Sequence, residues 1–265
     1  MAEPAARVRA WRPDVPGVTE VLHATFADHA YPMHTHDAWT VLVVDAGQVR
    51  YDLDRREHRT EPSQVVLLPP HVAHDGRAAS AHGFRKRVLY LDPAQLDVRR
   101  LGRSVDRPDR FDPALRTAVD RVHRAVAHPG DELEAEGWLA LVTARLGRHL
   151  AGAEPAPTHG RAATLARRLQ ELLDAHVVEG ISLATASAVL GARPSHLVRA
   201  FGRETGISPH RYLVGRRVDL ARRLLLAGER PGSVAVEVGF YDQAHLTRHF
   251  RQVLGVTPAA YARSA

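Results

Sequence analysis

A segment of 17 residues occurs twice near the carboxyl end of this chain. The copies are HLVRAFGRETGISPHRY, from His196 to Tyr212, and HLTRHFRQVLGVTPAAY, from His245 to Tyr261, which lie 49 residues apart. They share His, Leu, Arg, Phe, Gly, Pro and Tyr in one register. The Leu and Phe have the spacing of a buried helix face, the Gly suits the left-handed residue that ends a helix, and the Pro suits the first turn of the next helix. The duplication therefore predicts two helical units of similar build.

Each copy follows a shorter apolar segment and a tight turn. The upstream segments are SLATASAVLGAR before the first copy and GSVAVEVGFYD before the second. A short helix, a turn that contains glycine, and a longer second helix make a helix-turn-helix, whose second helix can enter the major groove of DNA. We therefore predict helix-turn-helix units at about residues 181–206 and 231–255.

The limits of the second recognition helix follow from its residue types. Asp242 can cap the amino terminus by accepting a backbone N–H, and Gly255 can end the helix in the left-handed conformation. The apolar stripe between them consists of Leu246, Phe250, Val253 and Leu254. The remaining polar faces are either solvated or reserved for a partner, and their recurrence in the duplicate favours a partner.

The signature VEVGFYDQAHLTRHFRQVLGVTPAAYA, from Val236 to Ala262, resembles the DNA-binding domain of the AraC/XylS family of transcriptional regulators along its whole length. The resemblance implies two helix-turn-helix units joined by a long helix, with one recognition helix in each of two successive major grooves. The segment 209–228 fits that linker, because about 20 residues make roughly 30 Å of helix, close to the DNA repeat of about 34 Å. Double-stranded promoter DNA is the implied partner, together with RNA polymerase if the protein is an activator.

The charge is distributed unevenly along the chain. From Arg161 to the end there are 15 Arg and 8 acidic residues, whereas the first 160 residues hold 21 Lys and Arg against 22 acids. All of the excess positive charge therefore lies in the part predicted to bind DNA, where it can neutralise phosphates. Lys86 is the only lysine, so coding bias explains the preference for Arg but not the asymmetry.

The outward faces of the two recognition helices supply the predicted DNA contacts. Arg pairs well with guanine, Gln with adenine, and phosphate contacts fix the register without reading sequence. The residues predicted to reach base edges are Ser195, His196, Val198, Arg199, Gln243, Ala244, Thr247 and Arg248. Those predicted to contact phosphates are Arg193, Arg203, Arg216, Arg217 and Arg251. Arg199 and Arg248 share a position of the repeat, so a structural bond to a neighbouring helix stays open for both.

The first 110 residues have the pattern of short β-strands separated by turns, which predicts a sandwich or barrel. The predicted strands are Val18–Phe26, Trp39–Gly47, Gln48–Arg55, Gln64–Pro70 and Phe84–Asp92. Two predicted turns, in MHTHDAWTVLVVDAG and LPPHVAHDG, resemble the two motifs of the cupin barrel. This resemblance implies a domain that senses a small-molecule effector.

The cupin resemblance carries over three metal-ligand positions, His34, His36 and His74. The acidic ligand of the cupins falls on Thr40, which cannot serve as one. We therefore expect no cofactor, and read the three histidines as a polar lining of the effector pocket or as hydrogen-bonded strand ends. The alternative is a divalent metal, because three neutral imidazoles are enough for an open site, with Asp37 or His71 to complete it.

Two apolar helices are predicted between the barrel and the DNA-binding part, at Asp112 to His128 and Asp131 to Gly152. They form an antiparallel pair that either mediates homodimerisation or only packs on the barrel. The segment at 152–160, rich in Pro, Ala and Gly, is predicted to be a linker. We therefore divide the chain into 1–110 (cupin-like barrel), 111–151 (helical pair), 152–160 (linker) and 161–265 (AraC-type domain).

The two resemblances together imply an α+β multidomain protein, in which a cupin-like β-barrel with a helical pair precedes an all-α domain of two helix-turn-helix units and a linker helix. The chain has 265 residues, no cysteine and no apolar run of the ~20 residues that a membrane span needs, so we expect a cytoplasmic protein. Motifs for nucleophilic catalysis or phosphate binding are missing from the sequence. We therefore predict a sequence-specific regulator rather than an enzyme. The alternative function is a metal-dependent cupin enzyme fused to a DNA-binding domain.

Overall fold

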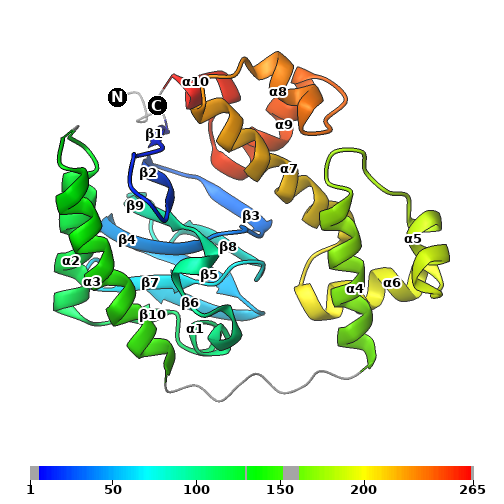
Figure 1. Cartoon of the computed structure of the whole chain (residues 1–265), viewed down its shortest axis with the longest axis horizontal. Helices are drawn as coiled ribbons and strands as arrows, with labels where there is room; N and C mark the ends of the chain where they lie inside the picture. Colours follow the sequence, from blue (N-terminus) through cyan, green and yellow to red (C-terminus); the bar gives the residue numbers. More distant parts are fainter. Residues whose placement is uncertain (1–5, 129, 152–160, 264–265) are drawn as a thin grey trace.

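The computed structural model describes residues 6–128, 130–151 and 161–263. A β-rich part occupies the amino-terminal half and a helical part the carboxyl-terminal half, as predicted (Figure 1). The proposed linker at 152–160 lies outside the described residues. Among the described residues, no helix combines the length and apolar character that crossing a membrane requires.

Two antiparallel sheets form the β-rich part. The strands are β1 (Arg7–Trp11), β2 (Val18–Phe26), β3 (Ala30–His34), β4 (Trp39–Gly47), β5 (Val49–Leu53), β6 (Arg56–Thr60), β7 (Val65–Leu68), β8 (His74–Ala78), β9 (Phe84–Leu91) and β10 (Asp109–Arg110). One sheet has the order β1-β2-β9-β4-β7-β10 and the other has the order β3-β8-β5-β6. Side chains of both sheets meet in one apolar core inside the barrel.

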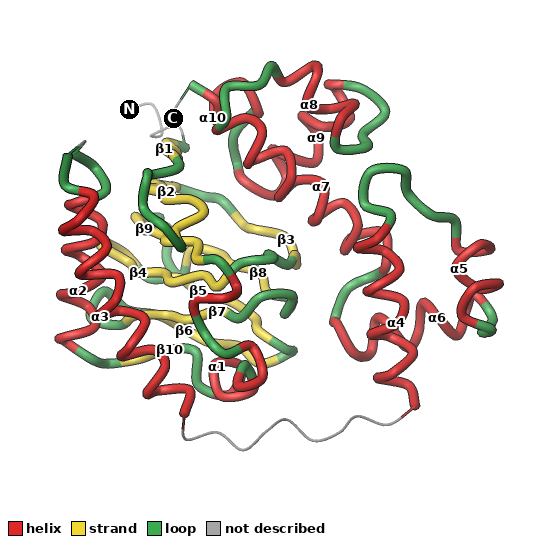
Figure 2. Tube along the Cα trace, viewed as in Figure 1, coloured by secondary structure: helices red, strands yellow, loops and turns green. Residues whose placement is uncertain are grey.

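Strand β4 has a nearly continuous apolar sequence because both of its faces are buried. Leu42 and Val44 point into the barrel, whereas Val41 and Val43 belong to a second core on the opposite face of the six-stranded sheet. Successive side chains of a strand alternate between faces, so a strand that is buried on both sides needs apolar residues throughout. This second core is completed by α2 (Pro113–Ala125) and α3 (Glu132–Ala151), which cover that face (Figure 2).

The helical pair at 111–151 thus packs on the barrel, which was one of the two alternatives. Of the apolar stripe predicted on the second helix, Val142, Leu146 and Leu150 are buried, but Leu133 is 82% and Leu141 is 53% exposed. Homodimerisation through this helix stays a prediction. Short segments, η1 (Pro93–Gln95), η2 (Val98–Arg100) and α1 (Gly102–Asp106), connect β9 to β10.

The carboxyl-terminal part contains two helix-turn-helix units joined by a long helix. Its helices are α4 (Arg161–Ala175), α5 (Leu183–Leu190), α6 (Pro194–Thr205), α7 (Pro209–Leu226), α8 (Pro231–Glu237), α9 (Gln243–Leu254) and α10 (Pro258–Ala262). Asp242 caps α9 by accepting the N–H of His245, and Gly255 ends it with φ at 75°, both as predicted. Helix α7 spans 18 residues between the two units (Figure 1).

The sequence missed five strands, β1, β3, β6, β8 and β10. Strands β6, β8 and β10 are mostly polar and β3 includes Pro32, so these four lack the apolar alternation on which the prediction relied, whereas β1 alternates over Arg7–Trp11 and was overlooked. The consequence matters for the site: His34 is the last residue of β3 and His74 the first residue of β8, and the two pair in register. Both had been assigned to turns, and this assignment was wrong.

Candidate functional site

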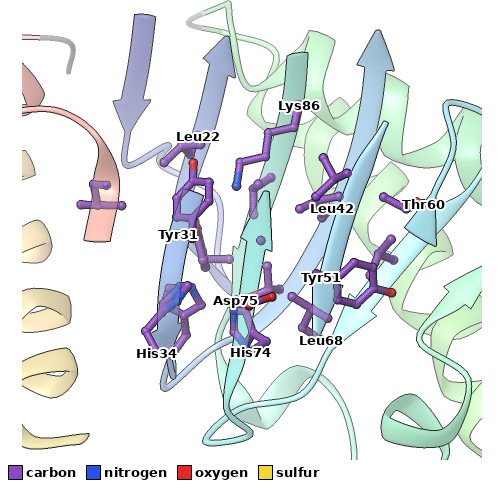
Figure 3. A pocket seen from close by; sticks show the side chains of 18 residues that line it. Leu22, Tyr31, His34, Leu42, Tyr51, Thr60, Leu68, His74, Asp75 and Lys86 are labelled. Atoms are coloured by element: carbon purple, nitrogen blue, oxygen red, sulfur yellow. The ribbon is translucent and has the colours of Figure 1, made fainter. Parts of the chain in front are cut away.

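A pocket lies inside the barrel between the two sheets (Figure 3). Aliphatic side chains line much of it, and the polar lining includes His34, His36, Thr40, Thr60, His74, Asp75 and Lys86. Figure 3 places His34 and His74 toward one end and Lys86 toward the other. The space open to water-sized molecules is about 40 Å³. Because one water needs roughly 10–15 Å³, the pocket holds a few waters, and a larger ligand requires wall side chains to move.

The three histidines predicted from the sequence converge at this pocket. His34, His36 and His74 are all buried, and their potential ligand atoms lie within 4.8 Å of one another. The Nε2 atoms of His34 and His36 are 3.2 Å apart. We call this group the histidine cluster.

The far nitrogen of each ring in the histidine cluster has its own partner. Nδ1 of His34 lies 2.7 Å from the carbonyl oxygen of Pro32, and Nδ1 of His74 lies 3.0 Å from that of Val72. Nδ1 of His36 lies 3.3 Å from Oδ1 of Asp219, which belongs to helix α7 of the DNA-binding part. Two rings are therefore fixed by local backbone, and the third is fixed by the other domain.

Burial keeps the histidine cluster neutral. Desolvation, followed by the charge that each ring would impose on its neighbours, holds the pKa of His34 and of His36 well below the ordinary value. Burial also lowers the pKa of His74 to about 4. Neutral imidazoles have a lone pair available for a metal, so the cluster fits a divalent transition metal chemically.

Thr40, which replaces the acidic ligand of the cupins, and Asp37 and His71, which were the alternatives for completing a metal site, do not join the histidine cluster. Thr40 lines the pocket, and its buried Oγ1 has no hydrogen-bond partner. Asp37 does not join the cluster, because its carboxylate binds Arg223 at 2.6 Å and Arg216 at 3.1 Å. Burial alone would raise the pKa of Asp37, but these two guanidinium groups hold it far below the usual range. His71 also lies outside the group of converging ligand atoms.

Lys86 lines the pocket and was not selected by the sequence analysis. It extends from β9 into the pocket, where its Nζ lies 3.9 Å from the centre of the Tyr31 ring. Burial, and then the positive charge of Arg222, lowers the pKa of Lys86 to about 7. A buried amine favours a ligand with a negative charge, because pairing offsets the cost of desolvation.

A buried polar network joins the barrel to the DNA-binding part. Arg222, on α7, is 3% exposed, and its Nη2 donates to Glu20 on β2 at 2.6 Å. The hydroxyl of Tyr261, in α10, donates to the same carboxylate. Asp219 extends the network, accepting from Nη1 of Arg222 at 3.4 Å and contacting His36. We call Glu20, His36, Asp219, Arg222 and Tyr261 the interdomain network.

Within this network, burial disfavours the charged form of Asp219. It is 6% exposed, and burial, followed by the negative charge of Asp37, raises its pKa to about 7. Arg222 of helix α7 is buried beside it. Its guanidinium is withdrawn from solvent because Glu20 lies opposite it in the barrel, which the linear sequence does not reveal.

The recognition helices present most of the predicted DNA contacts to solvent. The exposed residues of this set are Arg193, Ser195, His196, Arg199, Arg203, Gln243, Ala244, Arg248 and Arg251. Val198 and Thr247 are partly buried. Arg248 lies 3.2 Å from a ring nitrogen of His249 on its own helix. These positions are accessible to DNA, and their base and phosphate roles stay predictions.

Two of the predicted phosphate contacts have other partners in this structure. Arg216 binds Asp174 at 2.9 Å and Asp37 at 3.1 Å, so its guanidinium links α4, α7 and the barrel. Arg217 donates to the carbonyl oxygens of Val177 and Val178 after α4. Both arginines therefore have structural partners here, and their phosphate contacts stay predictions. Their spacing on α7 could not distinguish an inward from an outward arginine.

The sequence analysis also did not select Tyr241 among the predicted DNA contacts. It precedes the cap of α9 and is 89% exposed, beside the predicted base contacts. The sequence placed it in a turn. A large aromatic residue at this position is a signal that the first copy of the repeat lacks. Asp219, Glu20 and Lys86 had no sequence signal, because their partners lie far away along the chain.

Known proteins resemble the chain over both parts. A family model of AraC-like ligand binding domains matches residues 16–142, and a model of helix-turn-helix domains matches residues 186–264. The uncharacterized HTH-type transcriptional regulator YbfI of Bacillus subtilis is 24% identical over 223 residues, which are 82% of this chain and 81% of YbfI. The chain belongs to the AraC family of transcriptional regulators. This AraC-type regulator combines a ligand-binding domain with a DNA-binding domain.

Other relatives agree with this assignment. The probable transcriptional regulator LumQ of Photobacterium leiognathi is 32% identical over 94 residues, which are 35% of this AraC-type regulator and 38% of LumQ. ToxT from Vibrio cholerae O395 has a TM-score of 0.59 at 12% identity and covers 99% of this chain and 98% of its own. That likeness shows a shared two-domain fold. The sequence relatives are regulators, which confirms the predicted function and gives no support to the cupin enzyme.

Proposed function

We propose that an effector bound inside the barrel changes the position of the second helix-turn-helix unit and so changes how this regulator engages promoter DNA. The observation that carries the proposal is the place of Leu254. This residue ends the recognition helix α9, and its side chain lines the barrel pocket. A ligand that displaces the pocket wall therefore acts directly on the helix that carries Gln243 and Arg248.

The contact around Leu254 is close. At the next residue, Gly255, an added Cβ would lie 2.9 Å from a ring carbon of Phe26 and 3.2 Å from one of His29. Apolar residues of α9 and of the barrel interior form one continuous core. Close-packed cores transmit a change of volume because they hold few voids. A ligand that displaces Leu254 therefore acts on this contact, which adjoins it.

We propose an effector that is apolar and carries one acidic group. Lys86 supplies a positive partner, while the aliphatic wall, including Leu22, Leu42 and Leu68, accepts the apolar part. One ToxT structure is described as bound to an unsaturated fatty acid. That ligand belongs to ToxT, and for this chain the argument is the buried amine.

Calorimetric titration tests the effector class. The ligands are fatty acids of increasing length, aromatic acids, and the matching alcohols, and the matched control protein is Lys86→Met. We expect acids to bind the wild-type protein more tightly than alcohols by about 1–3 kcal/mol, the range for a hydrogen bond to a charged group, and we expect this preference to disappear in the variant. Equal binding of acids and alcohols by the wild-type protein would contradict the proposal.

DNA recognition is proposed to use the exposed faces of both recognition helices. Replacing Gln243 or Arg248 by Ala is expected to cost about 1–3 kcal/mol at the operator and to relax discrimination at one base pair. Binding is measured by fluorescence anisotropy on a site selected from a random duplex pool. An Arg248→Ala variant with unchanged operator affinity would show that the second unit docks differently.

We further propose a homodimer that forms through α3, with RNA polymerase as an additional partner if the protein activates transcription. The exposed Leu133 and Leu141 support the dimer, because large apolar side chains on one helix face often mark an interface. Light scattering at tens of micromolar protein tests it, with the double variant Leu133→Asp and Leu141→Asp as the comparison. A monomeric wild-type protein, with and without DNA, would exclude this dimer.

A further inference from the structure

The cupin resemblance implies a divalent transition metal at the histidine cluster, and we propose that Asp219, supplied by the DNA-binding domain, holds the metal ligand His36 in place. Metal binding in the barrel would then strengthen the attachment of helix α7. This inference rests on the proposed function only because DNA binding is one of its readouts.

The hydrogen bonds of two rings decide where their lone pairs lie. Nδ1 of His34 and Nδ1 of His74 each face a backbone carbonyl oxygen, at 2.7 and 3.0 Å. A carbonyl oxygen only accepts, so each Nδ1 carries the proton and each Nε2 keeps its lone pair. Metal-binding histidines typically donate their other ring N–H to a carbonyl or carboxylate oxygen in this way.

The spacing of the lone-pair nitrogens suits a metal. Two nitrogen ligands of a tetrahedral zinc ion, each at about 2.05 Å, lie roughly 3.3 Å apart. Nε2 of His34 and Nε2 of His36 are 3.2 Å apart, and His74 brings its ligand atom within 4.8 Å of both. Three imidazoles leave a coordination position open for water or for an acidic ligand.

The ring of His36 has two possible proton positions, and they connect differently to the other domain. With the proton on Nε2, the ring donates to His34, and Nδ1 can accept from Nη1 of Arg222 at 3.5 Å. With a metal on Nε2, the proton must lie on Nδ1, where its acceptor is Oδ1 of Asp219 at 3.3 Å. Metal binding therefore selects the arrangement in which the barrel donates a hydrogen bond to a carboxylate of α7.

This arrangement makes metal and DNA binding reciprocal. Asp219 is fixed on α7 close to Arg216 and Arg222, whose Nη1 atoms lie 3.9 and 3.4 Å from its two carboxylate oxygens. Any movement of α7 that withdraws Asp219 from His36 weakens the metal site. If a metal that holds Asp219 in place changes the affinity for DNA, bound DNA must change the affinity for the metal by the same factor, because the two binding equilibria are linked.

The first experiment tests the site itself. The full-length protein is purified without a polyhistidine tag, stripped with EDTA, and titrated with Zn²⁺ against a chromophoric chelator; Co²⁺ then reports the coordination by its visible spectrum. We expect one equivalent of metal in the wild-type protein and loss of stoichiometric binding in His74→Ala. A wild-type protein that retains less than about a tenth of an equivalent, on the one-site stoichiometry of such a centre, would overturn the proposal.

The second experiment tests the role of Asp219. Asp219→Asn keeps the shape and removes the charged acceptor, and we expect it to lower zinc affinity by about 10–100-fold while the Co²⁺ spectrum is retained. Asp174→Asn is the matched control, because Asp174 also binds Arg216 but does not contact the histidine cluster. If both variants bind zinc as the wild-type protein does, Asp219 does not support the site.

A measurement on the wild-type protein alone keeps the test valid if Asp219→Asn does not fold. Zinc affinity is determined with and without saturating operator DNA, and DNA affinity with and without zinc. We expect both affinities to change by the same factor, and an unchanged zinc affinity on DNA would overturn the coupling. Failure of the proposed effector function appears separately, as equal binding of acids and alcohols by a protein that still binds zinc.

Discussion

Tyr212 and Tyr261 occupy the same position in the two copies of the repeat, and the hydroxyl of each donates to a carboxylate. In the first unit the acceptor is Asp174 of α4, at 2.9 Å, within the same domain. In the second unit the acceptor is Glu20 of β2, in the barrel. Each ring also packs edge-on against the phenylalanine of its own copy, Phe201 or Phe250. Two units with one local design are thus attached to different parts of the molecule.

Their cores differ in the same way. The first unit forms a core of its own with α4, which the barrel meets through Ala73 and Met33. The apolar residues of the second unit belong to the core that fills the barrel. Figure 2 shows α5 and α6 on the side of the molecule away from the barrel, and α10 beside β1. On the proposed function, the first unit would therefore make a DNA contact that does not change with the barrel. The second unit would make a DNA contact that depends on the state of the barrel.

The largest expected effect comes from Arg222→Met. Removing this guanidinium leaves the buried carboxylate of Glu20 without its cation, which typically costs about 3–5 kcal/mol of unfolding free energy. Urea unfolding followed by tryptophan fluorescence measures it, since Trp11, Trp39 and Trp138 all lie in the barrel or in the helical pair that covers it. Arg216→Met, whose partners Asp174 and Asp37 are 32% and 25% exposed, serves as the control and should cost less. Equal costs would remove the distinction between the two attachments.

The next effect is a pH dependence that Lys86 imposes on the barrel. Its pKa is about 7 in the folded protein and about 10.4 in the unfolded chain, so the unfolded state binds more protons between these values. Stability therefore rises with pH across this window, by on the order of 3 kcal/mol, and the full penalty is present below pH 7. Lys86→Met should abolish this difference in urea unfolding between pH 6.5 and 9.5. A wild-type profile parallel to that of the variant would argue against a neutral buried amine.

A smaller effect separates the two repeated tyrosines. Tyr261→Phe removes a buried hydrogen bond to a charged acceptor and should cost about 1.5–3 kcal/mol, whereas Tyr212→Phe removes a partly exposed one and should cost about 1 kcal/mol. We expect only Tyr261→Phe to shift the tryptophan transition that reports the barrel. If Tyr212→Phe shifts it as much, the first unit is also coupled to the barrel.

The smallest effect concerns phosphate contacts. Arg203→Ala in the first unit and Arg251→Ala in the second should each weaken binding to all duplexes alike and flatten the logarithmic salt dependence by about one unit. Adding an effector should change the contribution that Arg251 makes to the salt dependence. It should not change the contribution that Arg203 makes. Anisotropy titrations over a range of salt concentrations, with and without ligand, provide the measurement. A loss confined to one sequence would mean base reading instead.

Local sequence was sufficient for much of this structure. The repeat predicted both helix-turn-helix units, and Asp242 and Gly255 cap α9 as expected. Strands β2 and β4 have the predicted limits. These features depend on neighbours within a few residues, where capping, turn conformation and apolar periodicity act. The three histidines were found for a similar reason, because their motif spacing resembles a known barrel.

Only the tertiary structure decided what joins the two domains. Asp219 and His36 are 183 residues apart, and Arg222 and Glu20 are 202 residues apart, yet each pair is in contact. Helix α7 contains five arginines and one acid, Asp219, and nothing in the local sequence tells which of them will be buried. Their burial depends on where the barrel presents an opposite charge, since burying a charged group is costly unless an oppositely charged partner is present. The sequence alone therefore determined the parts and their likeness to a regulator, and the packing of the barrel against α7 determined which residues connect them.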